Sequence, residues 1–139
     1  MFVLDTNVLS EMRRIRLGRG NLNVQAWADS VTPEALFLSA ITIEELEIGV
    51  LREERRDPRQ GSLLRAWLNG YVLPAFVDRI LPIDATIAQL SASFRVPDPH
   101  PIRDGPIAAT ALVHGMTVVT RNGIHFENTG VSLLNPWQS

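Results

Sequence analysis

The sequence predicts an α/β domain in which helices cover both faces of a mostly parallel sheet. Short apolar runs, typical of buried strands, begin at residues 2, 36, 79, 116 and 131. Segments with helical spacing of apolar residues separate most of these runs. Strands that alternate with helices favour parallel pairing in a three-layer domain. Because 139 residues are enough for one hydrophobic core, we expect a single domain over residues 1–139.

Composition limits the classes of function. Hydrophobic residues make up 45% of the chain and charged residues 20%, as in an ordinary globular protein. The absence of cysteine excludes disulfides and thiolate metal sites. The apolar runs are too short to span a membrane, and no signal peptide pattern is present, so we expect a cytoplasmic protein. The net charge of −2 argues against binding nucleic acid through bulk charge.

The first predicted strand, residues 2–4, is followed directly by Asp5 and then by a helix over residues 6–14. Ligands bind at the carboxyl edge of open α/β sheets, so Asp5 is a candidate site residue. The alternative is that Asp5 only caps the helix. Nearby arginines either form a solvated loop or hold phosphates beside a catalytic Asp5. They are Arg13, Arg14, Arg16 and Arg19.

A second acidic candidate, Glu45, follows the strand at residues 36–38. It lies in a predicted helix over residues 42–56. Thr42 and Glu45 match a capping box, in which Glu45 would accept a bond from the Thr42 amide. That is the structural alternative. In the functional alternative, Glu45 lies close enough to a strand end to face Asp5.

The middle of the chain carries mainly structural signals. Residues 52–59 alternate in charge and predict an exposed helix end and loop. A helix is expected from Ser62 until Pro74 ends or kinks it. Trp67 and Tyr71 have helical spacing on it and indicate core or a partner surface.

An edge strand is expected at residues 79–82, because a proline closes it. Asp84 is interpreted as the structural cap of a helix reaching residue 94. The prolines between residues 97 and 101 predict an extended loop in which His100 is exposed.

A third acidic candidate, Asp104, precedes a helix predicted over residues 106–114. Proline is favourable in the first turn of that helix, and Gly115 ends it. Strands are expected at residues 116–120 and 131–134.

Three carboxylates therefore lie near helix starts that converge on one edge of the predicted sheet: Asp5, Glu45 and Asp104. Without a cluster of histidine or cysteine, such oxygen ligands suit Mg²⁺ or Mn²⁺. A bound ion would activate water and polarise a phosphodiester oxygen. The alternative is three independent helix caps.

The sequence resembles the PIN-domain family, in particular VapC-type toxins of the FitB-like group. The stretches that carry the resemblance are LDTNVLSE, LSAITIEELEIGV, RDGPIAATALVHGMTVVTRN and SLLNPW. The resemblance implies a three-layer α/β/α domain with a five-stranded parallel sheet in the order 3-2-1-4-5. It also implies a Mg²⁺- or Mn²⁺-dependent endoribonuclease, the toxin of a toxin–antitoxin pair.

By the same resemblance, Asp5, Glu45 and Asp104 match the acidic residues of the family and are the expected metal ligands. Thr120 matches a supporting hydroxyl, and Asn122 the fourth acidic position. Since Asn122 is an amide, it supplies no charge.

The chain departs from the family pattern at two further positions. His125 stands where relatives often carry a carboxylate, so the expected site is less negative than the fullest version of the family. Pro106 replaces a larger apolar residue at a helix start.

The partners implied by the resemblance are an RNA substrate and a small antitoxin whose tail crosses the acidic groove. Operator DNA would bind only through the antitoxin, and a homodimer is implied. A first alternative is a PIN-like module that binds RNA or antitoxin but cleaves weakly, which Asn122 motivates. A second is a phosphohydrolase of the haloacid-dehalogenase type with Asp5 as nucleophile; it is disfavoured because Asn7 stands where a second acid is needed.

Overall fold

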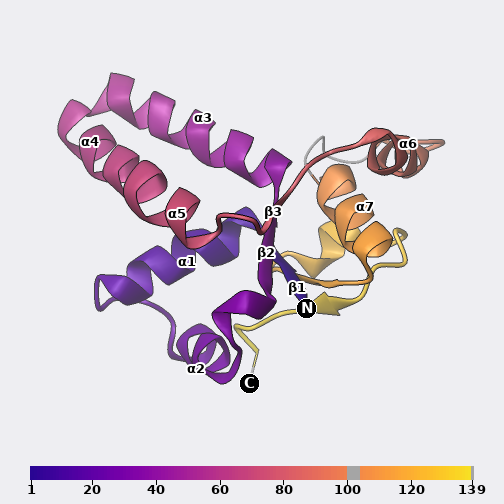
Figure 1. Cartoon of the computed structure of the whole chain (residues 1–139), viewed down its shortest axis with the longest axis horizontal. Coiled ribbons are helices and arrows are strands. Elements are labelled where there is room, and N and C mark those ends of the chain that lie inside the picture. The colour runs from indigo at the N-terminus through magenta and orange to yellow at the C-terminus, as the bar shows by residue number, and fades with distance from the viewer. Residues whose placement is uncertain (100–103, 139) are drawn as a thin grey trace.

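The structure is a computed structural model and describes residues 1–99 and 104–138. Within these residues, five parallel strands form one sheet in the order β3-β2-β1-β4-β5 (Figure 1). The strands are β1 Phe2–Leu4, β2 Leu36–Ser39, β3 Ile80–Leu81, β4 Thr117–Val119 and β5 Leu133–Leu134. The predicted sheet and its strand order are confirmed.

Helices cover both faces of this sheet. Figure 1 shows α1 and the hairpin of α3 and α4 on one side of the strands, and α6 and α7 on the other. The helices are α1 Thr6–Arg16, α2 Leu22–Ser30, α3 Ala40–Arg56, α4 Pro58–Trp67, α5 Leu73–Ala75, α6 Ala85–Ser93 and α7 Asp104–His114. None of the helices in the described part of the chain has the length and apolar character that crossing a membrane requires.

Two hydrophobic clusters lie on opposite faces of the sheet. In β1, Leu4 packs into the larger cluster with residues of α1 and α3, and Val3 packs into the smaller cluster. Ala108 and Ala111 of α7 belong to the smaller cluster, where their short side chains let the helix approach the sheet closely. Both faces of β1 are buried, as expected for a central parallel strand.

Helix α3 begins at Ala40, two residues before the predicted start. Its cap is Ser39, whose side-chain oxygen accepts a hydrogen bond from the Ile41 amide at 3.2 Å. The predicted capping box of Thr42 and Glu45 is therefore wrong, because Thr42 already lies inside the helix. Serine is a favoured cap residue, and here it is also the last residue of the preceding strand.

The helix end predicted near residue 56 is confirmed, but α4 begins at Pro58 rather than Ser62, so only Asp57 separates the two helices. The Asp57 side chain caps the helix by accepting a bond from the Gln60 amide at 3.3 Å. Gly61 lies against α3: an added Cβ would be 2.4 Å from the Glu54 Cα. The glycine thus serves close helix packing and not a turn.

The helical chain after α4 passes through a π turn at Leu68–Val72 and ends with α5 at Ala75, consistent with a break near Pro74. Trp67 packs against the core, whereas Tyr71 is exposed. Both rings face guanidinium groups of α1. The distance to the ring centroid is 5.9 Å for Arg13 over Trp67 and 3.4 Å for Arg16 over Tyr71.

The remaining elements follow the predictions with small shifts. β3 is an edge strand, and the Asp84 side chain caps α6 by accepting a bond from the Ile87 amide at 2.9 Å. Helix α7 begins at Asp104 instead of Pro106, and Gly115 follows it with a φ of +67°. The prediction that His100 is exposed falls outside the described residues.

Candidate active site

Asp5 lies at the carboxyl end of β1 and is only 2% exposed. Its Oδ1 accepts a hydrogen bond from the Thr6 amide at 2.8 Å, which caps α1. Its Oδ2 accepts from the Thr120 hydroxyl at 2.8 Å and from the Asn7 side-chain amide at 3.4 Å. Asp5 therefore caps a helix, as the structural interpretation predicts, and it also belongs to a polar cluster at the sheet edge. Its role as a site residue stays a prediction.

Thr120 reaches Asp5 because β1 and β4 are neighbouring strands in parallel register. Leu4 pairs with Val119, so the residues that follow them leave the sheet side by side. Thr120 is 1% exposed, and its Oγ1 accepts from the Asn122 backbone amide at 3.0 Å. The predicted supporting hydroxyl is thus in contact with the first candidate carboxylate.

Asn7 is a member of this cluster that the sequence analysis did not assign. Its side-chain amide donates to Asp5 and, at 3.3 Å, to the Thr120 hydroxyl oxygen. Its Oδ1 accepts from the Arg121 backbone amide at 3.3 Å. Its place two residues after Asp5, in the first turn of α1, was the signal available in the sequence.

The carboxylate of Asp5 accepts its hydrogen bonds from neutral groups. Thr6, Asn7 and Thr120 donate to it, and no ion pair to Asp5 occurs within residues 1–99 and 104–138. Neutral donors satisfy the hydrogen-bonding capacity of a carboxylate but bring no opposite charge. The carboxylate therefore presents net negative charge at the sheet edge.

Glu45 is half-buried in the second turn of α3. Its Oε2 accepts a hydrogen bond from the Thr6 hydroxyl at 3.3 Å. Since the Thr6 backbone amide donates to Asp5, Thr6 bridges the two acidic side chains. Glu45 thus faces the start of α1, as the functional interpretation predicts.

Asp104 is the first residue of α7 and is 1% exposed. The exposed His125 places its Nδ1 3.6 Å from the Asp104 Oδ2. Gly105 fixes this end of the helix against α6, because an added Cβ would lie 2.8 Å from the Ser91 hydroxyl. α7 also packs against β1 and α3, the elements that carry or precede the other two acidic residues.

The donor set fits a hard divalent cation. Two nearly fully buried carboxylates, Asp5 and Asp104, and the half-buried Glu45 supply oxygen ligands. Across the described residues, no three histidine, aspartate or glutamate side chains form a complete metal-binding group. Mg²⁺ commonly keeps several waters and uses one or two carboxylates, so a partial set of protein ligands suits it. The assignment of the three acids as ligands stays a prediction.

The arginines at the end of α1 do not lie beside Asp5. At 1.5 Å per residue, Arg13 lies about 12 Å from Asp5 along the helix. Arg13 and Arg16 stack on aromatic rings. Arg14 contacts Glu11 at 3.6 Å and donates to the Arg19 carbonyl at 3.3 Å. The helix thus carries Arg13, Arg14 and Arg16 away from Asp5, and the phosphate role of this group stays a prediction.

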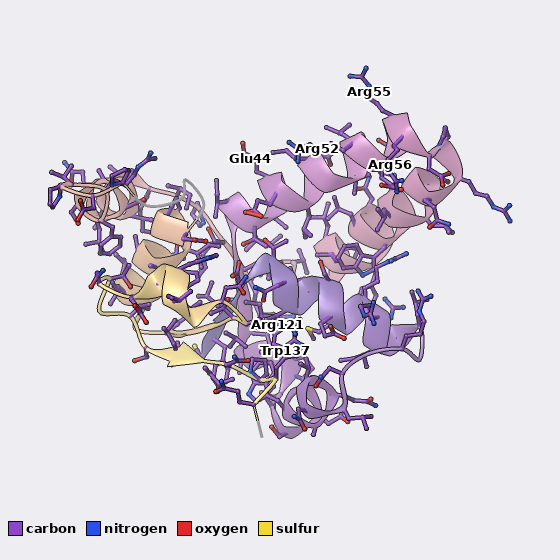
Figure 2. The ribbon with its side chains drawn as sticks, turned by 180° about the vertical axis from the view of Figure 1, so that it is seen from behind. Glu44, Arg52, Arg55, Arg56, Arg121 and Trp137 are labelled. Carbon is purple, nitrogen blue, oxygen red and sulfur yellow. The ribbon has the colours of Figure 1, made fainter. Side chains whose placement is uncertain are left out.

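A different arginine lies at the candidate site. Arg121 follows Thr120 directly, is exposed, and places its guanidinium 5.3 Å from the centroid of the Trp137 ring (Figure 2). Figure 2 also shows Arg52, Arg55 and Arg56 well away from this pair, along α3. The sequence signal was a basic residue immediately after a predicted strand.

The family model described as PIN domain matches residues 2–131. The chain is 39% identical to "VapC ribonuclease Y4jK" of Sinorhizobium fredii and 39% identical to "Toxin FitB" of Neisseria gonorrhoeae. Each alignment covers 99% of both chains. The crystal structure of FitAcB from Neisseria gonorrhoeae superposes with a TM-score of 0.88 at 38% identity, covering 100% of both chains.

Proposed function

The chain belongs to the PIN-domain family, and from this premise we propose that it is an endoribonuclease that depends on Mg²⁺ or Mn²⁺ and serves as the toxin of a toxin–antitoxin pair. The relatives named a VapC ribonuclease and a toxin support both parts, since the similarity extends over almost all of each chain. RNA as substrate is consistent with the expected cytoplasmic location.

The observation that carries the proposal is the Asp5 cluster. A carboxylate that is 2% exposed would lose hydration without compensation unless donors replaced the water. Here neutral donors replace it and leave the charge available to a cation. Asp104, equally buried at the start of α7, supplies a second carboxylate.

In the proposed reaction, Asp5 and Asp104 would hold the ion directly, and Glu45 would bind it through water or orient the attacking water. The ion would polarise a phosphodiester oxygen and lower the pKa of bound water. Thr120 is a positioning residue: its hydroxyl donates to the Asp5 Oδ2 and accepts from the Asn122 amide. Outer hydrogen bonds of this kind fix the orientation of a ligating carboxylate.

The proposed partners follow from the toxin assignment. An antitoxin would cover the acidic groove and supply a positive group against its carboxylates. This chain has a net charge of −2, so we assign operator DNA binding to the antitoxin. A homodimer stays a prediction, which sedimentation of the purified toxin would test.

The test is cleavage of single-stranded RNA with Mn²⁺ by Asp5→Asn and by the control Asp84→Asn. Both aspartates follow strands and cap helices, but Asp84 caps α6 through the Ile87 amide. Replacing a metal ligand should lower the cleavage rate more than about 100-fold, whereas Asp84→Asn should cleave like the parent. Undiminished cleavage by Asp5→Asn, or by the parent in excess chelator, would contradict the proposal.

A second candidate is a module that binds RNA or antitoxin and cleaves weakly. Asn122 favours it, since an amide stands at a position that is acidic in many relatives. So does the lack of a complete three-residue metal group among the described residues. Calorimetry separates the candidates: RNA binding without detectable binding of Mn²⁺ would support the module.

A further inference from the structure

The chain contains a second polar feature directly beside the Asp5 cluster. A cavity of about 520 Å³ is lined by Thr120 and Asn122 of that cluster, by Arg121 between them, and by Glu127, Leu133 and Gln138. The cavity therefore adjoins the candidate catalytic edge through two residues of the loop after β4. We propose that this cavity binds the nucleotide next to the scissile phosphate and that Arg121 holds the phosphate of that nucleotide. This inference rests on the proposed function.

Arg121 is fixed at its backbone and its side chain. Its amide donates to the Asn7 Oδ1 at 3.3 Å, and its carbonyl accepts from the Asn135 side-chain amide at 3.5 Å. Its guanidinium lies over the Trp137 ring. Stacking on an indole orients an arginine without using its N–H groups, which remain available to a phosphate.

Trp137 is itself held in place. Its backbone amide donates to the Asn135 Oδ1 at 2.9 Å, and its carbonyl accepts from the Asn23 side chain of α2 at 2.8 Å. Asn135 thus contacts both members of the stacked pair. This arrangement lowers the conformational entropy that Arg121 loses when it binds a ligand.

The guanidinium of Arg121 has no acidic partner in the part of the chain that the structure describes. Among the residues that the structure describes, no carboxylate forms an ion pair with it. By contrast, Arg14 pairs with Glu11 and Arg56 with Glu53. An unneutralised guanidinium beside the candidate site is the group that a phosphodiester requires, since arginine matches phosphate geometry with two parallel N–H donors.

The other lining residues suit the rest of a nucleotide. Leu133 and Ile124 provide apolar surface for a base, and Gln138 and Asn135 provide amide donors and acceptors. Among the described residues, Glu127 is the one carboxylate that lines the cavity. It suits a ribose hydroxyl or a base N–H and disfavours a second phosphate. One phosphate at Arg121 and one nucleoside in the cavity satisfy these groups.

The test measures RNA binding without cleavage. Full-length Asp5→Asn protein in excess chelator is titrated against a labelled, unstructured RNA at several salt concentrations. Adding Arg121→Gln should reduce the slope of log affinity against log salt by about 0.7, the value for one phosphate contact on a single strand. The same relation gives an affinity about fivefold lower at 0.1 M salt and little difference near 1 M salt.

Two further variants separate charge from stacking. Trp137→Leu keeps the charge and removes the ring, so the affinity should fall about two- to fivefold with the salt slope nearly unchanged. Arg55→Gln removes an exposed arginine of α3, far from Arg121 (Figure 2), and should leave affinity and slope as in the parent.

The outcomes are distinguishable. If the wild-type protein cleaves RNA but Arg121→Gln binds with the parent's affinity and slope, the nucleotide subsite is wrong and the nuclease assignment stands. An equal effect of Arg55→Gln would also contradict the subsite, since it would show diffuse electrostatic binding. If the wild-type protein neither cleaves nor binds RNA, both proposals fail.

Discussion

Two regions of the molecule use carboxylates in opposite ways. On the hairpin of α3 and α4, Arg65 donates to both oxygens of Glu47 at 2.6 Å and to Glu54 at 3.1 Å. At the sheet edge, Asp5 receives only neutral donors from the described residues. The carboxylates that join two helices are paired with an arginine of opposite charge. The carboxylate at the candidate site is contacted by neutral dipoles, which leave its charge uncompensated.

Exposure separates the two regions as well. Arg65 and its glutamates are partly open to water, which screens their attraction and limits its effect on stability. Asp5, Asp104 and Thr120 are all nearly inaccessible, so the interactions of a bound cation would be weakly screened. Substitutions at the edge should therefore affect activity, and substitutions on the hairpin should affect stability.

The largest effect that tests this comparison is expected for Thr120→Val. Loss of the hydroxyl removes a donor to Asp5 and an acceptor for the Asn122 amide. RNA cleavage should fall about 10- to 100-fold, as for other residues that orient a metal ligand. Cleavage rates and thermal unfolding are measured together.

The matched control for this variant is Thr110→Val. Thr110 is another buried threonine, but its hydroxyl donates to the Pro106 carbonyl within α7. It should cleave RNA like the parent. Equal losses of activity in both variants would mean that Thr120 acts only through the general stability of the fold.

An intermediate effect is expected for Asn122→Asp, which adds a negative charge at the loop that lines the site. Affinity for Mn²⁺ should rise about fivefold or more, which corresponds to roughly 1 kcal/mol for unit charges in a highly screened setting. Calorimetry with Mn²⁺ measures the change. An unchanged affinity for Mn²⁺ would show that the side chain at this position does not interact with the ion.

The smallest effect is expected on the hairpin. The hydrogen bond from Arg65 lowers the pKa of Glu47 below its ordinary value of 4.5. A carboxylate with a lowered pKa in the folded state stabilises the protein above its ordinary pKa, and this contribution is lost as the pH falls through the folded pKa. Glu47→Gln should therefore lower the urea midpoint slightly at pH 7, and the difference should vanish in acid.

The control for the hairpin is Glu44→Gln, on the same helix and exposed (Figure 2). It should have the parent's urea midpoint at both pH values. If Glu47→Gln lowers the urea midpoint equally at both pH values, the side chain stabilises the protein by packing. If this variant also reduces RNA cleavage, the expectation that hairpin substitutions affect only stability is wrong.

Much of the site was predictable because parallel topology determines which residues meet. Once β1 and β4 are neighbours, Asp5 and Thr120 must leave the sheet together, although 115 positions separate them. The strand-end positions of the acids were enough to predict this edge. The helix starts were less predictable, because several residues near Ser39 and Asp57 could also cap a helix. Packing determines which of them does so.

Other features required coordinates. Gly61 looks like a loop signal in the sequence, and only the proximity of the Glu54 backbone shows that it permits helix contact. Arg13 and Arg16 follow Asp5 in the sequence but stack on Trp67 and Tyr71. Arg121 gains its platform from Trp137, a residue contributed after β5, and no local pattern indicates that pairing.

Asp5 caps the first turn of α1 and also lies at the candidate site. This combination has a practical consequence. Asparagine caps a helix N-terminus about as well as aspartate does, so under the proposed function Asp5→Asn should lose cleavage while it keeps the fold. We expect such an inactive variant to be produced in growing cells without harm to them. It would still engage the antitoxin and compete with the active toxin for it.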